Sequence, residues 1–431
     1  IKVFENDKDI NIKGKQFKKG KSWVVPTSQP QYRMVRTMFE KVTEFADSIF
    51  YDASSWTMAL AYNVPFEGQS GFSAGKELSN LETQELTFPE TGNYVAYMVD
   101  WSDYFAPKFL YLIQKAGVHV ETNALPFTSL TDQGEKEFPA GSLVIPTAFQ
   151  KLSTEELRNI LQAAAKESGQ NVFASTTGFS KAGIDLGSNN ISAVQVPKVL
   201  MLVGQGTSQY EAGEIWHLMD TKVGMPISKV DLGSFGRLNL FDYNTLIMTS
   251  GNYSSLSSGQ LAHLKDWLSR GGTIIAMRSA SQWLQSQGII QEEYLSTTEE
   301  STSGSKPYAS RRDESGAQAI GGSIYTAYLD NTHPLGYGYR ATEIPVYRNT
   351  SIFFKPSKSP YQTPVSYTEN PLLGGYISPS NLEKVKQSAS VIVSPVGNGR
   401  VINFIDNPNF RGTWFGTNKL FFNAIFYGDK I

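Results

Sequence analysis

The chain has 431 residues, with 38 Lys and Arg against 40 Asp and Glu, a formal net charge of −2, and no cysteine. This balance argues against nucleic acid as the main partner, because nucleic-acid binders usually carry a basic stripe. The lack of cysteine excludes disulfides, iron–sulfur clusters, cysteine zinc sites and a cysteine nucleophile. Charged residues make up only 18% of the chain, which favours an extracytoplasmic protein, whether periplasmic, cell-surface or secreted.

Hydropathy bears on membrane insertion and on how the chain begins. No apolar run reaches the ~18–20 residues of a membrane span, so we expect none. The first residues, IKVFENDKDINIKGKQF, contain neither an apolar leader nor an initiator Met, and they resemble the interior of a strand-rich region. We therefore expect a fragment of a longer protein. The length predicts two to three domains.

Residues 1–90 are predicted to form a segment of strands followed by a helix. Apolar and polar residues alternate through residues 1–26, as they do in strands. From residue 32 to residue 50, apolar residues recur every three or four positions, which predicts an amphipathic helix. Residues 63–90 are rich in Gly, Ser, Pro and Thr and are typical of a long surface loop.

Residues 91–195 are predicted to form a first α/β unit in the order β-α-β-β-α-β. Its expected strands are Tyr94–Val99, Val118–Glu121, Ser142–Ile145 and Val172–Ala174. Its expected helices are Ala106–Ala116 and a second one from an N-cap at Ser153 to Ser168.

Residues 196–431 are predicted to form a second α/β unit, because the same order recurs about 105 residues later. The matching strands are Lys198–Val203, Ile227–Val230, Thr245–Met248 and Thr273–Ala276. The matching helices are Gln209–Asp220 and Ser257–Arg270. The fold class expected from this repeat is α/β, with tandem flavodoxin-like units built on parallel sheets. A polar, mobile loop over 285–325, further strands including Ser351–Lys355, and a helix over Asn418–Tyr427 are expected to complete the unit.

The turns after the last strand of each unit are candidate sites, because α/β sheets bind ligands at the carboxyl ends of their strands. These turns contain Ser175 in the first unit, and Arg278 and Ser279 in the second. An amidotransferase carries a cysteine nucleophile there, whereas a serine would need a nearby base. His333 is the loop histidine that folding could bring to either serine. Ser175, Ser279 and His333 are thus the catalytic candidates of a serine-dependent α/β hydrolase.

Two other kinds of site are disfavoured. The pairs His217/Asp220 and His263/Asp266 each share a helix face and could contribute to a metal site, but solvated helix faces are the preferred interpretation. The sequence contains no His-x-x-Glu or His-Glu-x-x-His zinc signature. Gly204-Gln205-Gly206 follows a strand as a dinucleotide-binding turn does, but it lacks the third glycine.

Several stretches resemble a known family. They are Trp23-Val24-Val25-Pro26-Thr27, Gln29-Pro30-Gln31-Tyr32-Arg33, Phe50 to Thr57, Asp330 to Gly336, Gly397 to Phe404, and Asn407-Pro408-Asn409-Phe410-Arg411-Gly412. This set is similar to the region that follows the catalytic domain in large bacterial zinc carboxypeptidase-like proteins. The last stretches resemble that family's terminal class I glutamine-amidotransferase-like domain. The resemblance covers most of the chain and involves no catalytic motif.

The resemblance implies a non-catalytic accessory region that serves scaffolding or substrate binding beside the peptidase domain of the same protein. The family's zinc ligands lie in that absent domain, so no cofactor and no metal are expected in this chain. Asp406 and Arg411 join Arg278 as candidate binding residues. Two alternatives stay open: the serine-dependent hydrolase named above, and a binding module for peptide or glycan, since the chain has 21 Tyr, 25 Phe and 7 Trp.

Overall fold

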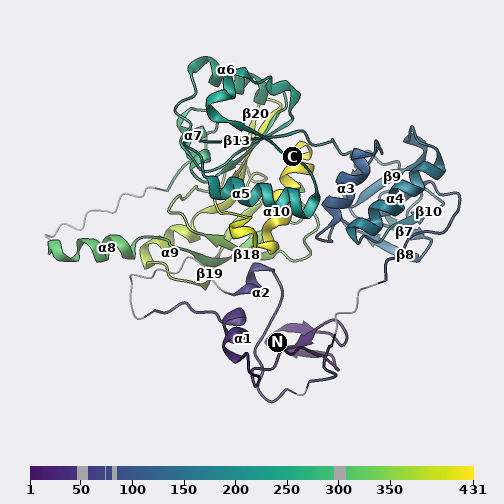
Figure 1. The fold of residues 1–431 in the computed structure, drawn as a ribbon, viewed down its shortest axis with the longest axis horizontal. Coiled ribbons are helices and arrows are strands. Elements are labelled where there is room, and N and C mark those ends of the chain that lie inside the picture. Colours follow the sequence, from purple (N-terminus) through teal and green to yellow (C-terminus); the bar gives the residue numbers. More distant parts are fainter. Residues whose placement is uncertain (46–56, 73, 80–84, 296–306) are drawn as a thin grey trace.

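The computed structural model describes residues 1–45, 57–72, 74–79, 85–295 and 307–431. Figure 1 shows an N-terminal segment, a small α/β unit and a large α/β unit as three parts of the ribbon. Two stretches named in the sequence analysis lie outside the described residues. They are residues 50–56, which are part of the family resemblance, and residues 296–304, which are part of the expected loop.

The N-terminal segment contains short strands and little core. Its elements are β1 (Phe4–Glu5), β2 (Ile10–Ile12), β3 (Lys15–Phe17), β4 (Trp23–Val24), α1 (Tyr32–Phe39) and α2 (Met58–Ala61). The helix expected from residue 32 to residue 50 ends at Phe39, because Glu40 adopts an extended backbone. Residues 46–50 of that prediction are not described. Leu60 and Ala61 of α2 pack with Tyr347, Phe410 and Trp414, and this contact fixes the segment to the large unit.

The small unit follows the predicted order of strands and helices, with the strand expected at Val118–Glu121 displaced to Glu121–Asn123, and it adds a hairpin and two further short strands. Its elements are β5 (Ala96–Val99), α3 (Ala106–Lys115), β6 (Glu121–Asn123), β7 (Phe127–Thr131), β8 (Gly134–Phe138), β9 (Leu143–Pro146), α4 (Thr154–Ser168), β10 (Phe173–Ser175), β11 (Ala182–Gly183) and β12 (Ile191–Ala193). Ser153 caps α4 in a capping box with Glu156.

The prediction of a parallel sheet is wrong for the small unit. Its strand order is β10-β5-β9-β6-β12, and each strand is antiparallel to its neighbours. The crossover through α3 joins β5 to β6 and the crossover through α4 joins β9 to β10. Each crossover skips one position in the sheet. Strand β9 lies between β5 and β6, and strand β5 lies between β9 and β10, each antiparallel to both of its neighbours. The unit is therefore a split β-α-β arrangement rather than a copy of the second unit.

The large unit is built on a nine-stranded sheet of order β14-β13-β15-β16-β21-β20-β19-β17-β18. Its strands are β13 (Val199–Val203), β14 (Ser228–Asp231), β15 (Thr245–Met248), β16 (Thr273–Met277), β17 (Ser323–Leu329), β18 (Glu343–Arg348), β19 (Val365–Gly374), β20 (Ala389–Val396) and β21 (Gly399–Phe404). Its helices are α5 (Gln209–Leu218), α6 (Ser258–Ser269), α7 (Ser279–Ser286), α8 (Arg311–Ala317), α9 (Pro379–Lys386) and α10 (Phe415–Phe426).

The sheet of the large unit changes character at β21. From β14 to β21 the neighbouring strands are parallel, as predicted, and from β21 to β18 they are antiparallel. No strand forms over Ser351–Lys355, where one was expected; Phe354 of that stretch makes an isolated bridge to Tyr294. Helix α8 forms within the expected loop and projects from the body of the protein in Figure 1.

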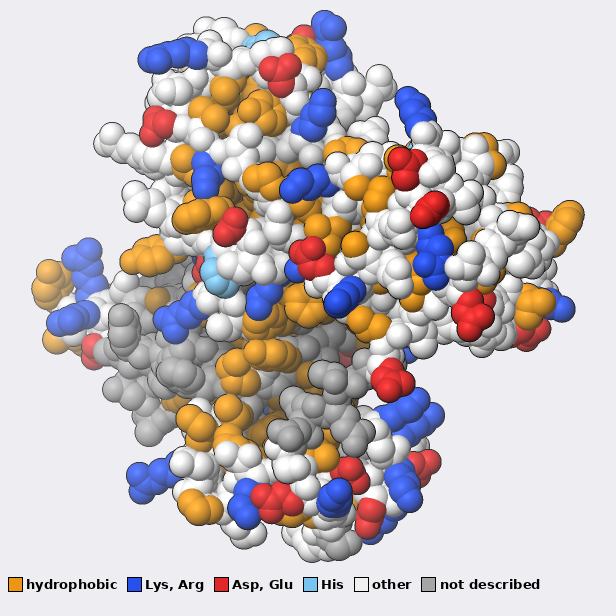
Figure 2. Space-filling view, turned by 45° about the vertical axis from the view of Figure 1, so that its right-hand side comes forward, with side chains coloured by type: hydrophobic (Ala, Val, Ile, Leu, Met, Phe, Trp, Pro, Cys, Tyr) orange, Lys and Arg blue, Asp and Glu red, His pale blue; other side chains and the backbone are white. Residues whose placement is uncertain are grey.

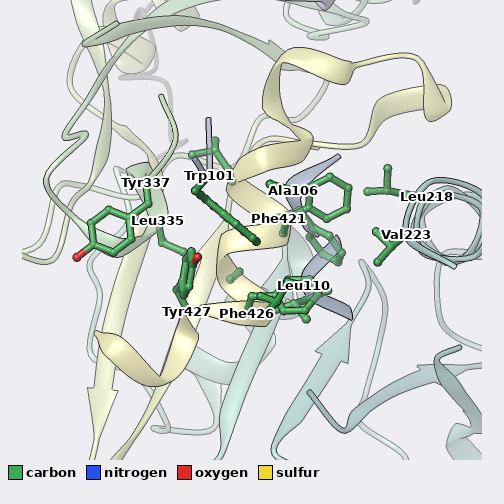
Figure 3. Close-up of a cluster of buried hydrophobic side chains, with 14 of the residues drawn as sticks. Trp101, Ala106, Leu110, Leu218, Val223, Leu335, Tyr337, Phe421, Phe426 and Tyr427 are labelled. Atoms are coloured by element: carbon green, nitrogen blue, oxygen red, sulfur yellow. The ribbon is translucent and has the colours of Figure 1, made fainter. Parts of the chain in front are cut away.

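Helix α10 joins the two α/β units, because aromatic side chains from both surround it. Trp101 of the small unit is fully buried, packs edge-on against Phe426 and at a tilt against Tyr427, and donates from Nε1 to Asn423 Oδ1 at 2.7 Å. Figure 3 shows this cluster with Tyr337 and Leu335 on one side and Leu110 on the other. Among the described residues, no helix is both long and apolar enough to span a membrane.

Candidate functional site

The parallel half of the large sheet brings several turns to one edge. Met277 of β16 lies in register with Phe404 of β21, and Met248 of β15 with Ala276. The residues that follow these strands, around Ser250, Arg278 and Asp406, therefore emerge on the same side. This is the edge at which parallel α/β sheets place ligands.

Arg278 forms a strained elbow between β16 and α7. Its backbone has φ 46° and ψ −107°, a region that residues other than glycine rarely adopt. Such a residue costs on the order of 1–3 kcal/mol and persists where the surroundings fix it. Its amide donates to Phe404 O at 2.7 Å, and its carbonyl accepts from Ser281 N at 3.0 Å as α7 begins.

The Arg278 side chain points into a polar cluster built from three other elements. It forms an ion pair with Glu211 of α5, whose side chain is 2% exposed. Its Nε donates to Ser250 Oγ at 3.0 Å and its Nη1 donates to Asn349 Oδ1 at 2.6 Å. Glu211 in turn accepts from Ser250 N at 2.6 Å and from Ser250 Oγ at 2.7 Å. The elbow thus holds a cation that is matched by a buried carboxylate.

A second carboxyl group lies one helical turn further along α5. Glu214 accepts from Asn407 Nδ2 at 2.7 Å and from the Arg411 backbone N at 2.6 Å. Burial raises the pKa of the Glu214 carboxyl, and the nearby Glu211 carboxylate adds to the effect, while these hydrogen bonds and Arg278 oppose it. Through Glu214, helix α5 fixes the loop that follows β21. Arg411 contributes its backbone, which has φ 52°, and its exposed side chain lies over the Phe410 ring at 5.3 Å.

Asp406 belongs to a separate buried network, and in the described residues no hydrogen bond joins it to Arg278, Glu211 or Ser250. Its Oδ1 accepts from Arg348 Nη1 at 3.2 Å, and its Oδ2 accepts from Tyr367 and Ser390 at 2.6 Å each. Burial raises the pKa of the Asp406 carboxyl despite Arg348. The ion pair between Arg348 and Asp406 fixes the starts of two loops that contribute to the site. Asn349 follows Arg348 in the sequence, and Asn407 follows Asp406.

The catalytic candidates do not converge. Ser175 is buried in β10 of the small unit, where its Oγ lies 2.9 Å from the carbonyl oxygens of Leu130 and Thr177 and donates to one of them. Ser279 does lie beside Arg278, but its Oγ accepts from Gly251 N at 2.9 Å. His333 caps a short turn, where its Nδ1 accepts from Leu335 N at 3.1 Å. Burial lowers the pKa of His333 to about 4. Within the described residues, no hydrogen bond joins His333 to either serine.

No hydrogen bond in the described part of the chain joins either histidine–aspartate pair to the Arg278 cluster, although the His217 ring lies near Gly412 in the loop after β21. Asp266 pairs with Arg270 at 2.9 Å, and His263 packs edge-on against Phe241. His217 and Asp220 are both exposed. Among the described residues, no group of three or more His, Asp or Glu side chains is arranged to hold a metal ion.

Four contributors to the cluster were missed by the sequence analysis: Glu211, Ser250, Asn349 and Glu214. Ser208 and Glu211 match the Ser-x-x-Glu pattern of a capping box, which would turn the glutamate back to its own helix start. In the structure, Ser208 does cap α5, but the Glu211 carboxylate turns inward to Ser250 and Arg278. The sequence carries no signal for this choice, because the partners are 39 and 67 residues away.

No family model and no curated protein matches the sequence. Among solved structures, the chain is similar to a ThuA-like protein from Bacteroides uniformis, at 13% identity over 53% of this chain and 91% of that chain, with a TM-score of 0.34. It is also similar to a GMP synthase protein from Thermoplasma acidophilum, at 10% identity over 53% and 96%, with a TM-score of 0.32. An exo-β-1,4-mannosidase from an Opitutaceae bacterium gives 10% identity over 64% and 39%, with a TM-score of 0.29. These values are too low to place the chain in any of these families.

Proposed function

We propose that this chain is a non-catalytic accessory region with a glutamine-amidotransferase-like large unit. In that unit, an ion-paired arginine stands at the strand-to-helix turn where an amidotransferase carries its nucleophile. One observation carries the proposal: Arg278 has the strained backbone of such an elbow, and its side chain is bound by the buried Glu211. The sequence resemblance supports the further proposal that the region serves scaffolding or substrate binding beside the zinc-binding peptidase domain of an extracytoplasmic carboxypeptidase-like protein.

The chemistry of the elbow supports the lack of catalysis. An arginine guanidinium stays protonated at every physiological pH, so it cannot attack a carbonyl carbon. The adjacent Ser279 would need a base within about 3.2 Å to become a nucleophile. Its hydroxyl oxygen instead accepts from Gly251 N, and the residue that follows Asp406 is Asn407, an amide that cannot take up a proton.

The charged surface is consistent with a protein or small-molecule partner rather than nucleic acid. Figure 2 shows Lys and Arg side chains interspersed with Asp and Glu on the face drawn, together with scattered apolar side chains. Nucleic-acid binders gather basic residues into a stripe.

Hydrolysis assays on the purified chain test the proposal. Release of ammonia from glutamine, of C-terminal residues from peptides and of nitrophenol from nitrophenyl esters should stay at background. The same background is expected for Ser279→Ala, Ser175→Ala, His333→Ala and Glu214→Gln. Turnover that disappears in one of these variants would support the serine-dependent hydrolase, or an acid–base role for Glu214, and would overturn the non-catalytic assignment.

The proposed partner needs a separate test. Sequencing the coding region upstream of Ile1 should reveal a domain with a His-x-x-Glu pair and a distant histidine. If such a domain is encoded, it should be expressed and purified separately from this chain. The two proteins should then form a complex that elutes as one species when they are mixed. An upstream region without those zinc ligands would refute the carboxypeptidase parent while leaving the elbow argument unchanged.

A further inference from the structure

The cluster around Arg278 contains N–H groups that are not hydrogen-bonded within the cluster. A guanidinium carries five N–H groups, and three of them bind Ser250, Asn349 and Glu211. Within the described part of the chain, the two other N–H groups of Arg278 and both amide N–H groups of Asn349 have no protein acceptor. The Arg278 side chain is 17% exposed, and Asn349 is half-buried, so the edge of the cluster reaches the surface.

The same cluster also has acceptor capacity left. Each oxygen of Glu214 accepts one N–H group, from Asn407 and from Arg411. A carboxylate oxygen has two lone pairs, so each can accept once more. A ligand that both donates and accepts would therefore satisfy this edge better than one that does only one of these.

The balance of charge selects among such ligands. One guanidinium, on Arg278, stands against two carboxyl groups, on Glu211 and Glu214, so the cluster is neutral or negative according to the state of Glu214. A negatively charged ligand would be repelled by these carboxylates, and a desolvated cation would be opposed by Arg278. A neutral ligand with several hydroxyl groups meets neither penalty.

An exposed aromatic ring lies on α5, the helix that carries Glu211 and Glu214. Tyr210 is 89% exposed and precedes Glu211 on the first turn of α5. That turn is held against the site, because Ser208 N donates to Ser250 O at 2.7 Å. Aromatic side chains offer an apolar face together with a polar tip, which suits the apolar face and the hydroxyl groups of a sugar ring.

From these observations, we propose that the elbow edge of the large sheet binds a neutral saccharide. Its ring would pack on Tyr210, and its hydroxyl groups would bond to Arg278, Asn349 and Glu214. This inference deepens the proposed accessory function and rests on it, since that function assigns Arg278 at the elbow to binding and not to catalysis.

Isothermal titration of the whole chain with neutral gluco-, galacto-, manno- and xylo-oligosaccharides tests the proposal, with acidic oligogalacturonides as the charge contrast. At least one neutral series should bind, and Tyr210→Ala should weaken that binding at least about tenfold, equivalent to ~1.4 kcal/mol. Asn349→Ala should weaken it as well. Tyr361→Ala is the matched control, because Tyr361 is 82% exposed and lies in the segment before β19. It should change nothing, and Tyr210→Ala and Tyr361→Ala should both keep the wild-type Tm.

Three results would overturn the saccharide site. The first is the absence of binding by every neutral series at ~10 mM, about tenfold above a Kd of 1 mM. The second is equal binding by wild type and both site variants, and the third is a preference for the acidic series. Hydrolysis of a bound oligosaccharide would instead refute the non-catalytic function while supporting the site. The two proposals therefore fail separately.

Discussion

Arg278 and Glu211 form an ion pair across 67 residues of sequence, at the point where strand β16 turns into helix α7. The arginine sits on a backbone with φ 46°, and the glutamate is almost fully buried. The pair links the elbow to α5, and Ser250 and Asn349 complete it from two further loops. A strained backbone and a buried charge are both unfavourable in isolation, and here each stabilises the arrangement that the other requires.

Removal of one partner of this pair should destabilise the protein strongly. Arg278→Met leaves the Glu211 carboxylate buried without a counter-charge, so we expect a loss of about 3 kcal/mol in the free energy of unfolding. Urea denaturation measures it. The double variant Arg278→Met/Glu211→Gln should recover most of the loss. Arg270→Met, which removes an exposed pair with Asp266, is the control and should cost less than about 1 kcal/mol. Equal losses at the two sites would contradict the buried pair.

The strain at the elbow predicts that glycine at position 278 gives a more stable protein than alanine, the reverse of the order in an ordinary helix or strand. Arg278→Gly and Arg278→Ala both remove the ion pair, but only glycine adopts φ 46° without steric cost. We expect the glycine variant to be the more stable by about 1 kcal/mol. Comparison of their urea midpoints isolates this difference. An alanine variant of equal or greater stability would mean that the backbone at 278 relaxes once the side chain is gone.

His333 should make the protein sensitive to acid. Its pKa in the folded state is about 4, because burial disfavours the charged ring, whereas an unfolded histidine has a pKa of ~6.5. The unfolded chain therefore binds the proton first, and stability should fall as the pH drops from about 6.5 to 4, by about 3 kcal/mol in total.

His333→Asn tests this assignment. The asparagine oxygen can accept from Leu335 N as the histidine Nδ1 does, so the turn keeps its cap. The variant should lose stability less steeply between pH 6.5 and 4 than the wild type, as measured by thermal unfolding at each pH. Parallel curves for the two proteins would show that other groups govern the acid response.

Asn423 should hold the two α/β units together. Its side chain accepts from Trp101 Nε1 and donates to the carbonyls of Leu335 and Tyr337 at 2.8 Å. Asn423→Leu leaves these three groups buried without partners, so a loss of about 3 kcal/mol is expected. Asn190→Ala, at an exposed position, is the control. If Asn423→Leu matched the control in thermal unfolding, water would have to replace the lost bonds.

Much of the large unit could be predicted from the sequence, because its signals are local. Thr245–Met248 forms β15 with the expected bounds, and the strand expected at Thr273–Ala276 extends by one residue to Met277. The elbow at Arg278 was found for the same reason: a strand pattern ends there and a helix pattern begins. Capping was also predictable, since Ser153 bonds within three residues.

The sequence by itself determined the alternation of strands and helices, the absence of a cysteine nucleophile and the residue at the elbow. Tertiary structure alone decided which strands became neighbours. The two units share one element order, yet the crossovers through α3 and α4 of the small unit each skip a strand position, whereas those through α5 and α6 of the large unit join adjacent strands. Tertiary structure also chose Glu211 as the partner of Arg278. Both outcomes depend on contacts between distant residues, and local patterns of hydrophobicity and capping do not encode them.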